Sequence, residues 1–501
     1  MPKILLGAMS WMFLATFLQA AENEIAVDSA ESRSAGAVYA RHLEYTINLI
    51  VDEYVRPVSR TDLMFAALSG LYEAAKIPVP SSLRADIEAA KSDSARVALM
   101  TEARQKLGDL ESLRGTAALV ASIQAMCKTL DPYTTLLSGE ELVRVNQEEN
   151  NRGLGLEFHK NGGNGPVRIK NVLPGSPAQK AGLRPDDLIT QINGLPPDVG
   201  FIALGIPQWT RPLRNEPPRD EQPIPSDPVE LTVERAGSRI IWKVRLTPAI
   251  FRPETVWGVT RKPDNSWDFI LDQSKQIAFL RVGSMGEGTA EELQETLAEL
   301  QAQGIRGLIL DLRWNPGGFF NEAVAAARLF MGEELIARIK TRNGTDREYP
   351  GKRDVNFLNF PMVVLVNGET SGGAELIAAA LQDNQRALVA GQRTLGKASV
   401  QSTKALRVSN LGLKLTSGTF VRPSGKNLHR FPDSRRTDDW GVLPNPKLEF
   451  RISADAARQL REWYLWQTLR PGGSIEALPL DDPVADPQRY AAWMALAEKI
   501  K

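Results

Sequence analysis

Cysteine and histidine, two side chains that often carry nucleophilic chemistry, are scarce in this sequence. Among 501 residues there is one cysteine, Cys127, and there are three histidines, at positions 42, 159 and 429. A single cysteine excludes an internal disulfide. Because Cys127 lies in an apolar helical pattern, we expect it to pack in a core rather than to act as a nucleophile.

An excess of charge of either sign is also missing. Sixty basic residues balance sixty acidic ones, and the sequence pI is about 6.9. This balance gives no support to the basic surface that a general nucleic-acid binder needs. The apolar fraction of 43% and the charged fraction of 24% are typical of a globular protein. A length of 501 residues predicts two or three domains.

Long apolar runs are absent except at the N-terminus. Lys3 is followed by an apolar stretch at residues 4–18 and then by small and polar residues at positions 19–22. This order is typical of a secretory signal peptide, which we place at residues 1–21. The stretch is short for a membrane span, which needs about 20 residues, but an uncleaved anchor is the alternative. In both cases we expect an exported protein (periplasmic, in the cell envelope or secreted) with no other contact to a membrane.

Composition and periodicity change along the chain and predict four regions after the leader. A helical pattern comes first and ends at Asp131-Pro132, a natural helix stop. Glycines and short strands follow, interrupted by a proline-rich surface insertion. The predicted regions are 37–136 (helical), 150–250 (β-rich, with the insertion at 196–228), 255–450 (α/β core) and 453–501 (C-terminal helical segment).

In the third region apolar strands alternate with helices. This rhythm predicts a layered α/β core around a largely buried sheet. The predicted strands are 277–282, 308–312, 362–366 and 387–390, and the predicted helices are 291–303, 321–331 and 374–382.

A phosphate-binding loop is suggested by Gly391-Gln-Arg-Thr-Leu-Gly396-Lys397, which follows an apolar strand. Such a loop next needs a Ser or Thr for Mg²⁺ and a helix whose N-terminus faces the phosphate. Here Ala398 follows, and residues 400–413 have the pattern of a strand. We therefore expect no nucleotide.

A strand-entry turn at Gly153-Leu154-Gly155-Leu156 can present successive backbone N–H groups to a carboxylate. Alone, this motif also suits an ordinary strand entry. Together with residues 175–178 and 181–194, however, it resembles the PDZ domains of bacterial proteases, element by element and in order. The resemblance implies binding of C-terminal peptide tails at Gly153, Leu154, Gly155 and Leu156. The long insertion leaves the tail preference open.

Three further stretches, 311–318, 366–376 and 396–401, resemble the carboxy-terminal processing (tail-specific) proteases. Asp131-Pro-Tyr-Thr134 upstream and residues 441–444 downstream belong to the same resemblance, which runs from about residue 37 to the C-terminal region. The implied fold class is multidomain α/β. It comprises a helical N-terminal region, a PDZ-like β-rich module, a layered α/β protease core and a C-terminal helical segment.

The family resemblance also implies roles for individual residues. Lys397 takes the part of the general base, with Gln401 orienting its amine, and the backbone N–H groups of Gly318 and Gly373 form the oxyanion hole. Lowering the pKa of a lysine from about 10.4 to near 7 costs roughly 4 kcal/mol, and burial is the usual means. No histidine lies in these motifs, so a Ser-His-Asp triad has little support.

The sequence departs from the family at the nucleophile. The family serine precedes the glutamate equivalent to Glu375 by three residues and the lysine by 25, and both counts lead to Gly372. Either the flexible turn lets the adjacent Ser371 fill the nucleophile site, or Ser371 only caps the following helix. The retained Lys397 and Gln401 favour the first alternative.

The sequence therefore predicts an exported serine endopeptidase that binds C-terminal tails and cleaves by a mechanism of Ser371 and Lys397. The alternative is a catalytically inactive relative that acts as a tail-binding scaffold. A third hypothesis, an unrelated exported α/β binding protein, requires the ordered motifs to be accidental. We expect unstructured protein tails as partners and no metal or organic cofactor, while homo-oligomerisation is left open.

Overall fold

The structure, a computed structural model, describes most of the chain after residue 34. It divides into two compact units, and each is considered by itself. The first unit is Met1–Asn146, Thr341–Thr345 and Val400–Gly418, and the second is Gln147–Lys340, Asp346–Ser399 and Thr419–Lys501. The described residues are 35–139, 141–142, 151–158, 165–197, 227–235, 240–262, 266–342, 344, 346–353, 357, 359–407, 410–469, 478, 482 and 484–500.

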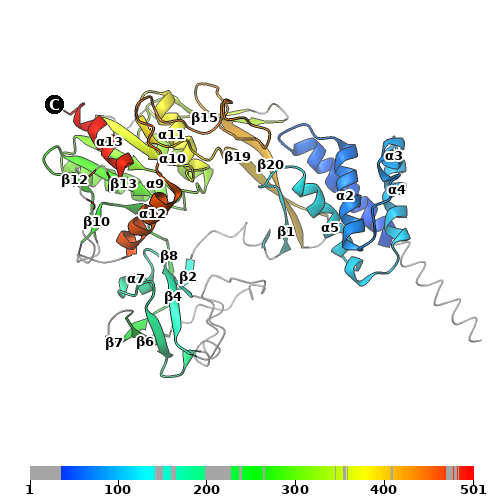
Figure 1. The fold of residues 1–501 in the computed structure, drawn as a ribbon, viewed down its shortest axis with the longest axis horizontal. Coiled ribbons are helices and arrows are strands. Elements are labelled where there is room, and N and C mark those ends of the chain that lie inside the picture. Colours follow the sequence, from blue (N-terminus) through cyan, green and yellow to red (C-terminus); the bar gives the residue numbers. More distant parts are fainter. Residues whose placement is uncertain are drawn as a thin grey trace, which may run out of the picture. The chain divides into compact units, whose positions relative to one another are not determined.

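The first unit is built on packed helices (Figure 1). Gly70 allows two of them, α2 and α5, to approach closely, because a Cβ at this position would lie 2.4 Å from the Cβ of Ala125. Cys127 is buried in this core, as predicted, and burial raises the pKa of its thiol to about 12. The helices are a segment at 35–53, α2 (Arg60–Ala74), α3 (Leu83–Ala89), α4 (Asp93–Lys106), the short 3₁₀ turn η1 (Glu111–Leu113) and α5 (Ala117–Lys128).

A turn at Asp131 ends the helical part of this unit. The Asp131 carboxylate accepts hydrogen bonds from the backbone N–H groups of Tyr133, at 2.7 Å, and Thr134, at 2.8 Å. Strand β1 (Thr135–Ser138) follows and pairs antiparallel with the start of β20 (Leu411–Val421).

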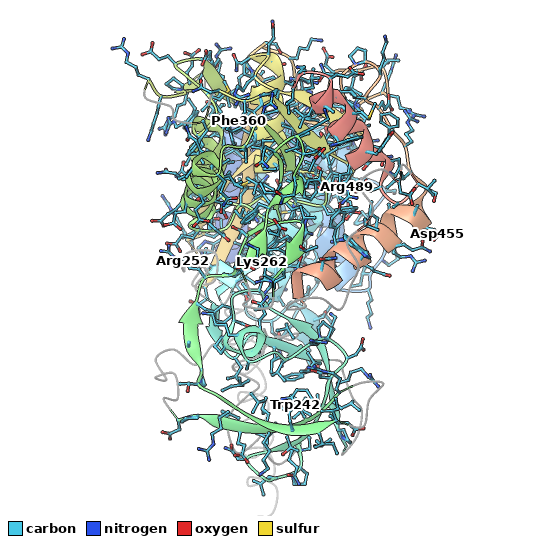
Figure 2. All side chains as sticks on the ribbon, turned by 90° about the vertical axis from the view of Figure 1, so that its left-hand side faces the viewer. Trp242, Arg252, Lys262, Phe360, Asp455 and Arg489 are labelled. Atoms are coloured by element: carbon cyan, nitrogen blue, oxygen red, sulfur yellow. The ribbon has the colours of Figure 1, made fainter. Side chains whose placement is uncertain are left out.

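The β-rich module lies in the second unit. Its main sheet is antiparallel in the order β3-β4-β5-β6-β7, and its interior is filled by aliphatic side chains. Trp242 lies on β7, the last strand of that sheet (Figure 2). The elements are β2 (Asn151–Gly153), β3 (Leu156–Phe158), β4 (Val167–Val172), α7 (Pro177–Lys180), β5 (Leu188–Ile192), β6 (Val229–Glu234), β7 (Ile241–Leu246) and β8 (Ala249–Phe251).

The α/β core contains a mixed sheet in the order β12-β13-β14-β17-β18, with β9 also paired to β13. Neighbours from β13 to β18 are parallel and follow the chain order across the sheet. The intervening helices must therefore lie on one face, because such crossovers are right-handed. The sheet strands are β9 (Val256–Trp257), β12 (Ile270–Asp272), β13 (Ile277–Val282), β14 (Gly307–Asp311), β17 (Met362–Val366) and β18 (Leu388–Gly391).

Two C-terminal helices, α12 (Ala454–Leu469) and α13 (Pro487–Ala497), bury side chains against alternate sheet residues such as Phe279 and Ile309. All positions of β13, β14 and β17 are buried, as expected for a parallel sheet covered on both faces. The remaining core elements are α9 (Thr289–Ala302), α10 (Phe320–Arg328), α11 (Gly373–Asp383), β10 (Thr260–Arg261), β11 (Trp267–Asp268), β15 (Leu335–Thr341), β16 (Arg347–Pro350) and β19 (Ser399–Ala405).

The predicted fold class is confirmed, and the four predicted core strands match β13, β14, β17 and β18 to within one residue at each end. The segment 400–413 is not one strand, because β19 ends at Ala405 and β20 begins at Leu411. A strand still follows Lys397 where a phosphate-binding loop needs a helix. The predicted signal peptide and most of the insertion at 196–228 lie outside the described residues. Within the described part of the chain, no helix is long and apolar enough to cross a membrane.

Candidate active site

The turn between β17 and α11 is tightly bound to itself and to a neighbouring loop. Asn367 Oδ1 accepts from the backbone N–H groups of Glu369 and Thr370, each at 3.1 Å. The Thr370 hydroxyl donates to the Leu312 carbonyl at 2.8 Å. Leu312 begins the loop after β14, the parallel neighbour of β17, so both loops leave the same edge of the sheet. This edge is where open α/β sheets place their ligand sites.

Gly372 has a backbone conformation that residues with side chains rarely adopt, with φ 60° and ψ −124°. A sharp, strained strand-to-helix turn is the feature that displays the nucleophile in serine hydrolases. A Cβ at position 372 would meet Gly317 Cα at 3.4 Å and the Pro316 carbonyl oxygen at 3.5 Å, which is ordinary contact. The turn therefore keeps the backbone form of a nucleophile elbow and room for a side chain.

Ser371 is buried, with 4% of its surface exposed. Its hydroxyl donates to the Pro316 carbonyl at 2.8 Å, and its backbone N–H donates to the Asn315 carbonyl at 2.9 Å. Gly372, not Ser371, is the N-cap residue of α11. The expectation that the Ser371 side chain caps the helix is therefore wrong, because the hydroxyl is bound to the adjacent loop instead.

Glu375 holds this turn to the loop that carries Lys397. Its fully buried carboxylate accepts from the backbone N–H groups of Gly372 at 3.1 Å, Gly396 at 2.7 Å and Lys397 at 2.7 Å. The Thr394 hydroxyl donates to the same carboxylate. Burial raises the pKa of Glu375 to about 7, although these four donors favour the charged form. The sequence motif contained Glu375, but its contacts depend on a loop 19 to 22 residues further along.

The loop with Gly318, one of the two proposed oxyanion donors, is built around Asn315. The Asn315 side chain donates to the Val282 carbonyl at 2.8 Å and accepts from the Gly317 N–H at 2.8 Å. Gly318 has φ 147° and lies so close to Met285 that a Cβ would be 2.2 Å from the Met285 carbonyl oxygen. Gly373 is the first residue of α11, so its N–H has no acceptor within the helix. Both proposed donors thus flank the Ser371-Gly372 turn.

Lys397 follows Gly396, whose φ is 84°, and its side chain is partly buried. The backbone N–H of Leu395 donates to the Thr370 carbonyl at 3.0 Å, which attaches the lysine loop to the elbow from a second side. Gln401 belongs to the other unit, where its Nε2 donates to the Thr416 hydroxyl at 3.5 Å. Within the second unit the structure thus gathers the loops of Ser371, Gly373, Gly318 and Lys397.

The chain was compared with models of known protein families. Residues 276–436, which include both site loops and Lys397, match the model of Peptidase family S41. This part of the chain, called the S41 core below, is therefore similar to peptidase family S41. Residues 142–199 match the PDZ domain model, so a PDZ domain precedes the S41 core. Both matches confirm the resemblances drawn from the sequence motifs.

Curated relatives are between a quarter and a third identical to this chain over the aligned residues. The carboxyl-terminal-processing protease of Synechocystis is 29% identical over 340 residues, 67% of this chain and 72% of the relative. The chloroplastic C-terminal processing peptidase of Tetradesmus obliquus is 27% identical over 64% of this chain and 65% of its own length. The carboxy-terminal processing protease CtpA of Bacillus subtilis is 28% identical over 62% of this chain and 61% of its own length.

Solved structures with a similar course of the chain include the photosystem II D1 C-terminal processing protease. It has a TM-score of 0.44 at 21% identity, over 86% of this chain and 98% of its own. The tricorn protease has a TM-score of 0.36 at 13% identity, over 82% of this chain and 38% of its own.

A buried ion cluster, which no pattern in the sequence predicts, supports the loop of the S41 core that carries Gly318. Arg313 donates to both carboxylate oxygens of Asp311 and to both of Asp486, which caps α13. Burial opposes the charge of Arg313, but the two carboxylates raise its pKa well above the ordinary value. Likewise, although burial opposes its charge, Asp486 has a lowered pKa because Arg313 lies beside it. Asp486, which lies near the C-terminus, thereby holds the start of the loop that carries Gly318.

The proposed tail-binding turn of the PDZ domain is compact. Gly155 has φ 77°, and a Cβ there would lie 2.1 Å from the Ser176 Cβ. Its carbonyl accepts from the Leu173 N–H at 2.9 Å, and the Leu154 carbonyl accepts from the Ala178 N–H at 3.0 Å. Leu154 and Leu156 are buried in the domain core. Glycine is therefore required at position 155 by close packing as well as by backbone conformation.

Proposed function

We propose that this protein binds the unstructured C-terminal tails of protein substrates through its PDZ domain and cleaves them by serine chemistry. The similarity to family S41 and the intact elbow support this function. The observation that carries it is the Glu375 carboxylate, which joins the elbow and the Lys397 loop as one structure. Such a connection keeps a nucleophile and its base in fixed relation, as general-base catalysis requires.

The proposed reaction uses Ser371 as the nucleophile. Its hydroxyl turns away from the Pro316 carbonyl by rotation about χ1, and its oxygen bonds to the scissile carbonyl carbon. The Lys397 amine takes the hydroxyl proton and gives it to the departing amine as the peptide C–N bond breaks. The N–H groups of Gly318 and Gly373 stabilise the oxyanion. Water then hydrolyses the acyl-enzyme and releases Ser371.

A second function, tail binding without hydrolysis, is favoured by one specific observation. The elbow position itself is Gly372, and the hydroxyl beside it is already bound to Pro316. In this case a protein with an intact PDZ domain captures tails and releases them uncut, and serine-reactive probes do not label it.

Cleavage of a fluorescent peptide with a free C-terminal tail separates the two functions. If Ser371 is the nucleophile, Ser371→Ala and Lys397→Ala each reduce turnover by at least about 10³-fold, whereas Ser81→Ala in an exposed turn leaves it unchanged. Turnover that survives Ser371→Ala eliminates Ser371 as the nucleophile. Binding of the tail with no turnover by the unmodified protein supports the second function.

We also propose that the protein is exported. The support is the pattern of residues 1–21, which has the order of a secretory signal peptide. Detection of the full-length chain in the cytoplasmic fraction, with none outside it, would contradict this proposal.

A further inference from the structure

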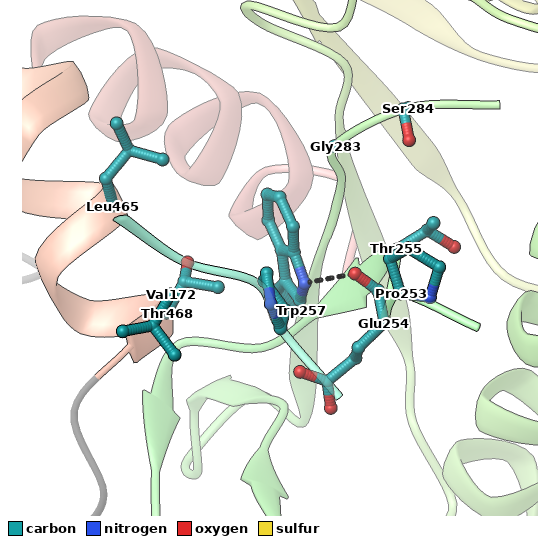
Figure 3. A pocket seen from close by; sticks show the side chains of 10 residues that line it. Val172, Pro253, Glu254, Thr255, Trp257, Gly283, Ser284, Leu465 and Thr468 are labelled. Atoms are coloured by element: carbon teal, nitrogen blue, oxygen red, sulfur yellow. Dashed lines mark hydrogen bonds between the residues drawn. The ribbon is translucent and has the colours of Figure 1, made fainter. Parts of the chain in front are cut away.

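A pocket of about 240 Å³ lies where the PDZ domain meets the S41 core (Figure 3). The PDZ domain contributes Val172 and Pro174, the segment after β13 contributes Ser284, and α12 contributes Leu465. Trp257, on strand β9 of the core sheet, lies at the centre of the lining and forms one of its walls. The pocket belongs neither to the elbow nor to the tail-binding turn.

The Trp257 ring is held in place by its surroundings. Its indole N–H donates to the Glu254 carbonyl at 3.1 Å, as the dashed line in Figure 3 shows. The ring lies directly on Gly283, where a Cβ would be 2.1 Å from its nearest carbon atom. This wall is therefore preformed rather than shaped by a ligand.

The Glu254, Thr255 and Thr468 side chains of the lining already have partners within the protein. The Glu254 carboxylate accepts from Trp267 at 3.0 Å and pairs with Arg261. The Thr468 hydroxyl donates to the Tyr464 carbonyl at 2.8 Å. Apart from the Ser284 hydroxyl, the pocket consequently presents to a ligand the apolar surface of its valine, proline, tryptophan and leucine side chains.

On the PDZ side the pocket lies directly behind the tail-binding turn. Val172 pairs with Leu156 in the sheet, and the N–H of Leu173 donates to the Gly155 carbonyl at 2.9 Å. If the last residue of a tail is held at this turn, the residues before it must run from the PDZ domain toward the core.

On the core side the pocket lining ends next to a segment that contacts the loop of Gly318. Gly283 and Ser284 directly precede Met285, whose N–H donates to the Gly317 carbonyl at 2.8 Å. The Met285 carbonyl in turn accepts from the Phe319 N–H at 2.8 Å. The pocket therefore lies between the two proposed contact points of one substrate.

We propose that this pocket receives an apolar side chain of the substrate tail, from the stretch between the residues at the PDZ turn and those at the elbow. This inference rests on the proposed tail-binding function. The pocket volume of about 240 Å³ is below the roughly 300–1,000 Å³ of sites for drug-sized ligands. It suits one large aliphatic or aromatic side chain. The substrate class is thus a tail with an internal apolar anchor in addition to its free terminus.

The test measures binding by the full chain with Lys397→Ala, which prevents turnover. The probes are fluorescein-labelled 14-residue peptides with a fixed free C-terminus and a Ser/Gly remainder, in which one Phe is moved residue by residue upstream. At one position we expect Phe to lower Kd about tenfold relative to Ser, as burial of a large apolar side chain allows. An amidated C-terminus serves to measure the contribution of the PDZ turn.

Leu465→Asn provides the matching protein variant, because Leu465 is 46% exposed and the fold does not depend on it. We expect this change to abolish the preference for Phe and to leave the Kd of the Ser/Gly peptide unchanged. Leu443→Asn is the control, since Leu443 is equally exposed, at 48%, but does not line the pocket.

The outcomes separate the pocket from the proposed function. Binding that needs the free carboxylate but shows no positional preference overturns the pocket assignment alone. The same holds if the preference survives Leu465→Asn, or if Leu465→Asn instead abolishes self-association of the protein, which would make a second copy the occupant. Failure of every free-carboxylate peptide to bind overturns both the pocket and the tail-binding function.

Discussion

At position 372 the backbone has a conformation that strains any residue with a side chain, and this chain has glycine there. Holding a non-glycine residue in such a region costs of order 1–3 kcal/mol, and active sites are where proteins commonly accept that cost. Gly372 keeps this conformation, with a φ of 60°, although it has no side chain. The contacts that hold it are the bond from the Gly372 N–H to Glu375 and the bond from Ser371 to the neighbouring loop. The elbow is therefore a property of the surrounding contacts rather than of the nucleophile side chain.

Glu375 makes stability depend on pH. Its pKa rises on folding from 4.5 to about 7, so the folded state binds its proton more tightly than the unfolded state. The contribution of Glu375 to the free energy of unfolding is therefore fully present below pH 4.5 and is lost as the pH rises through 7. The free energy of unfolding falls by ~3 kcal/mol over this range. Glu375→Gln removes this ionisation, so its free energy of unfolding should lack that part of the pH dependence.

Urea unfolding between pH 4.5 and 8 measures this difference. Glu299→Gln, on an exposed position of α9, is the control and should follow the unmodified protein at every pH. Parallel pH profiles for the unmodified protein and Glu375→Gln would show that Glu375 does not titrate as argued.

At the scale of elements, α13 and β14 are connected by charge rather than by apolar packing alone. Asp311 ends β14, Asp486 begins α13, and Arg313 pairs with both in a fully buried position. Removing one member of such a cluster leaves uncompensated charge in the interior. The start of the loop that carries Gly318 thereby depends on the C-terminal helix.

Arg313→Met should lower the free energy of unfolding by about 3–5 kcal/mol, because two buried carboxylates lose their partner. Arg461→Met should cost less than about 1 kcal/mol, since Arg461 pairs with Glu369 at the surface. Denaturant unfolding of the two variants side by side measures both values. Equal losses would mean that the buried cluster contributes no more than a surface pair.

The strands and crossover helices of the core could be predicted because apolar runs and helical periodicity are local properties. The position of Gly372 could be predicted as well, by counting residues within the motifs. The partner of the Ser371 hydroxyl could not, because Pro316 lies 55 residues away on another loop. The same is true of Arg313 and Asp486, 173 residues apart. Long-range polar contacts have no periodic pattern in a sequence.

At the scale of the whole molecule, a PDZ domain that we propose holds a substrate tail precedes an S41 core whose elbow is joined to the Lys397 loop by Glu375. The domain boundaries predicted from composition remain predictions. Hydrolysis through Ser371 and hydrolysis that needs Gly372→Ser differ in the nucleophile side chain. Both would use the same backbone, namely the elbow, the two proposed oxyanion donors and the loop of Lys397.

The most direct test of that machinery is hydrolysis of a tailed peptide by Gly372→Ser. Because the elbow has room for a Cβ and keeps its strained backbone, we predict that this variant folds, at a cost of ~1–3 kcal/mol in stability. Its turnover should equal or exceed that of the unmodified protein and should disappear in the Gly372→Ser, Lys397→Ala double variant. A folded Gly372→Ser protein that binds the tail but shows no Lys397-dependent hydrolysis would contradict the account.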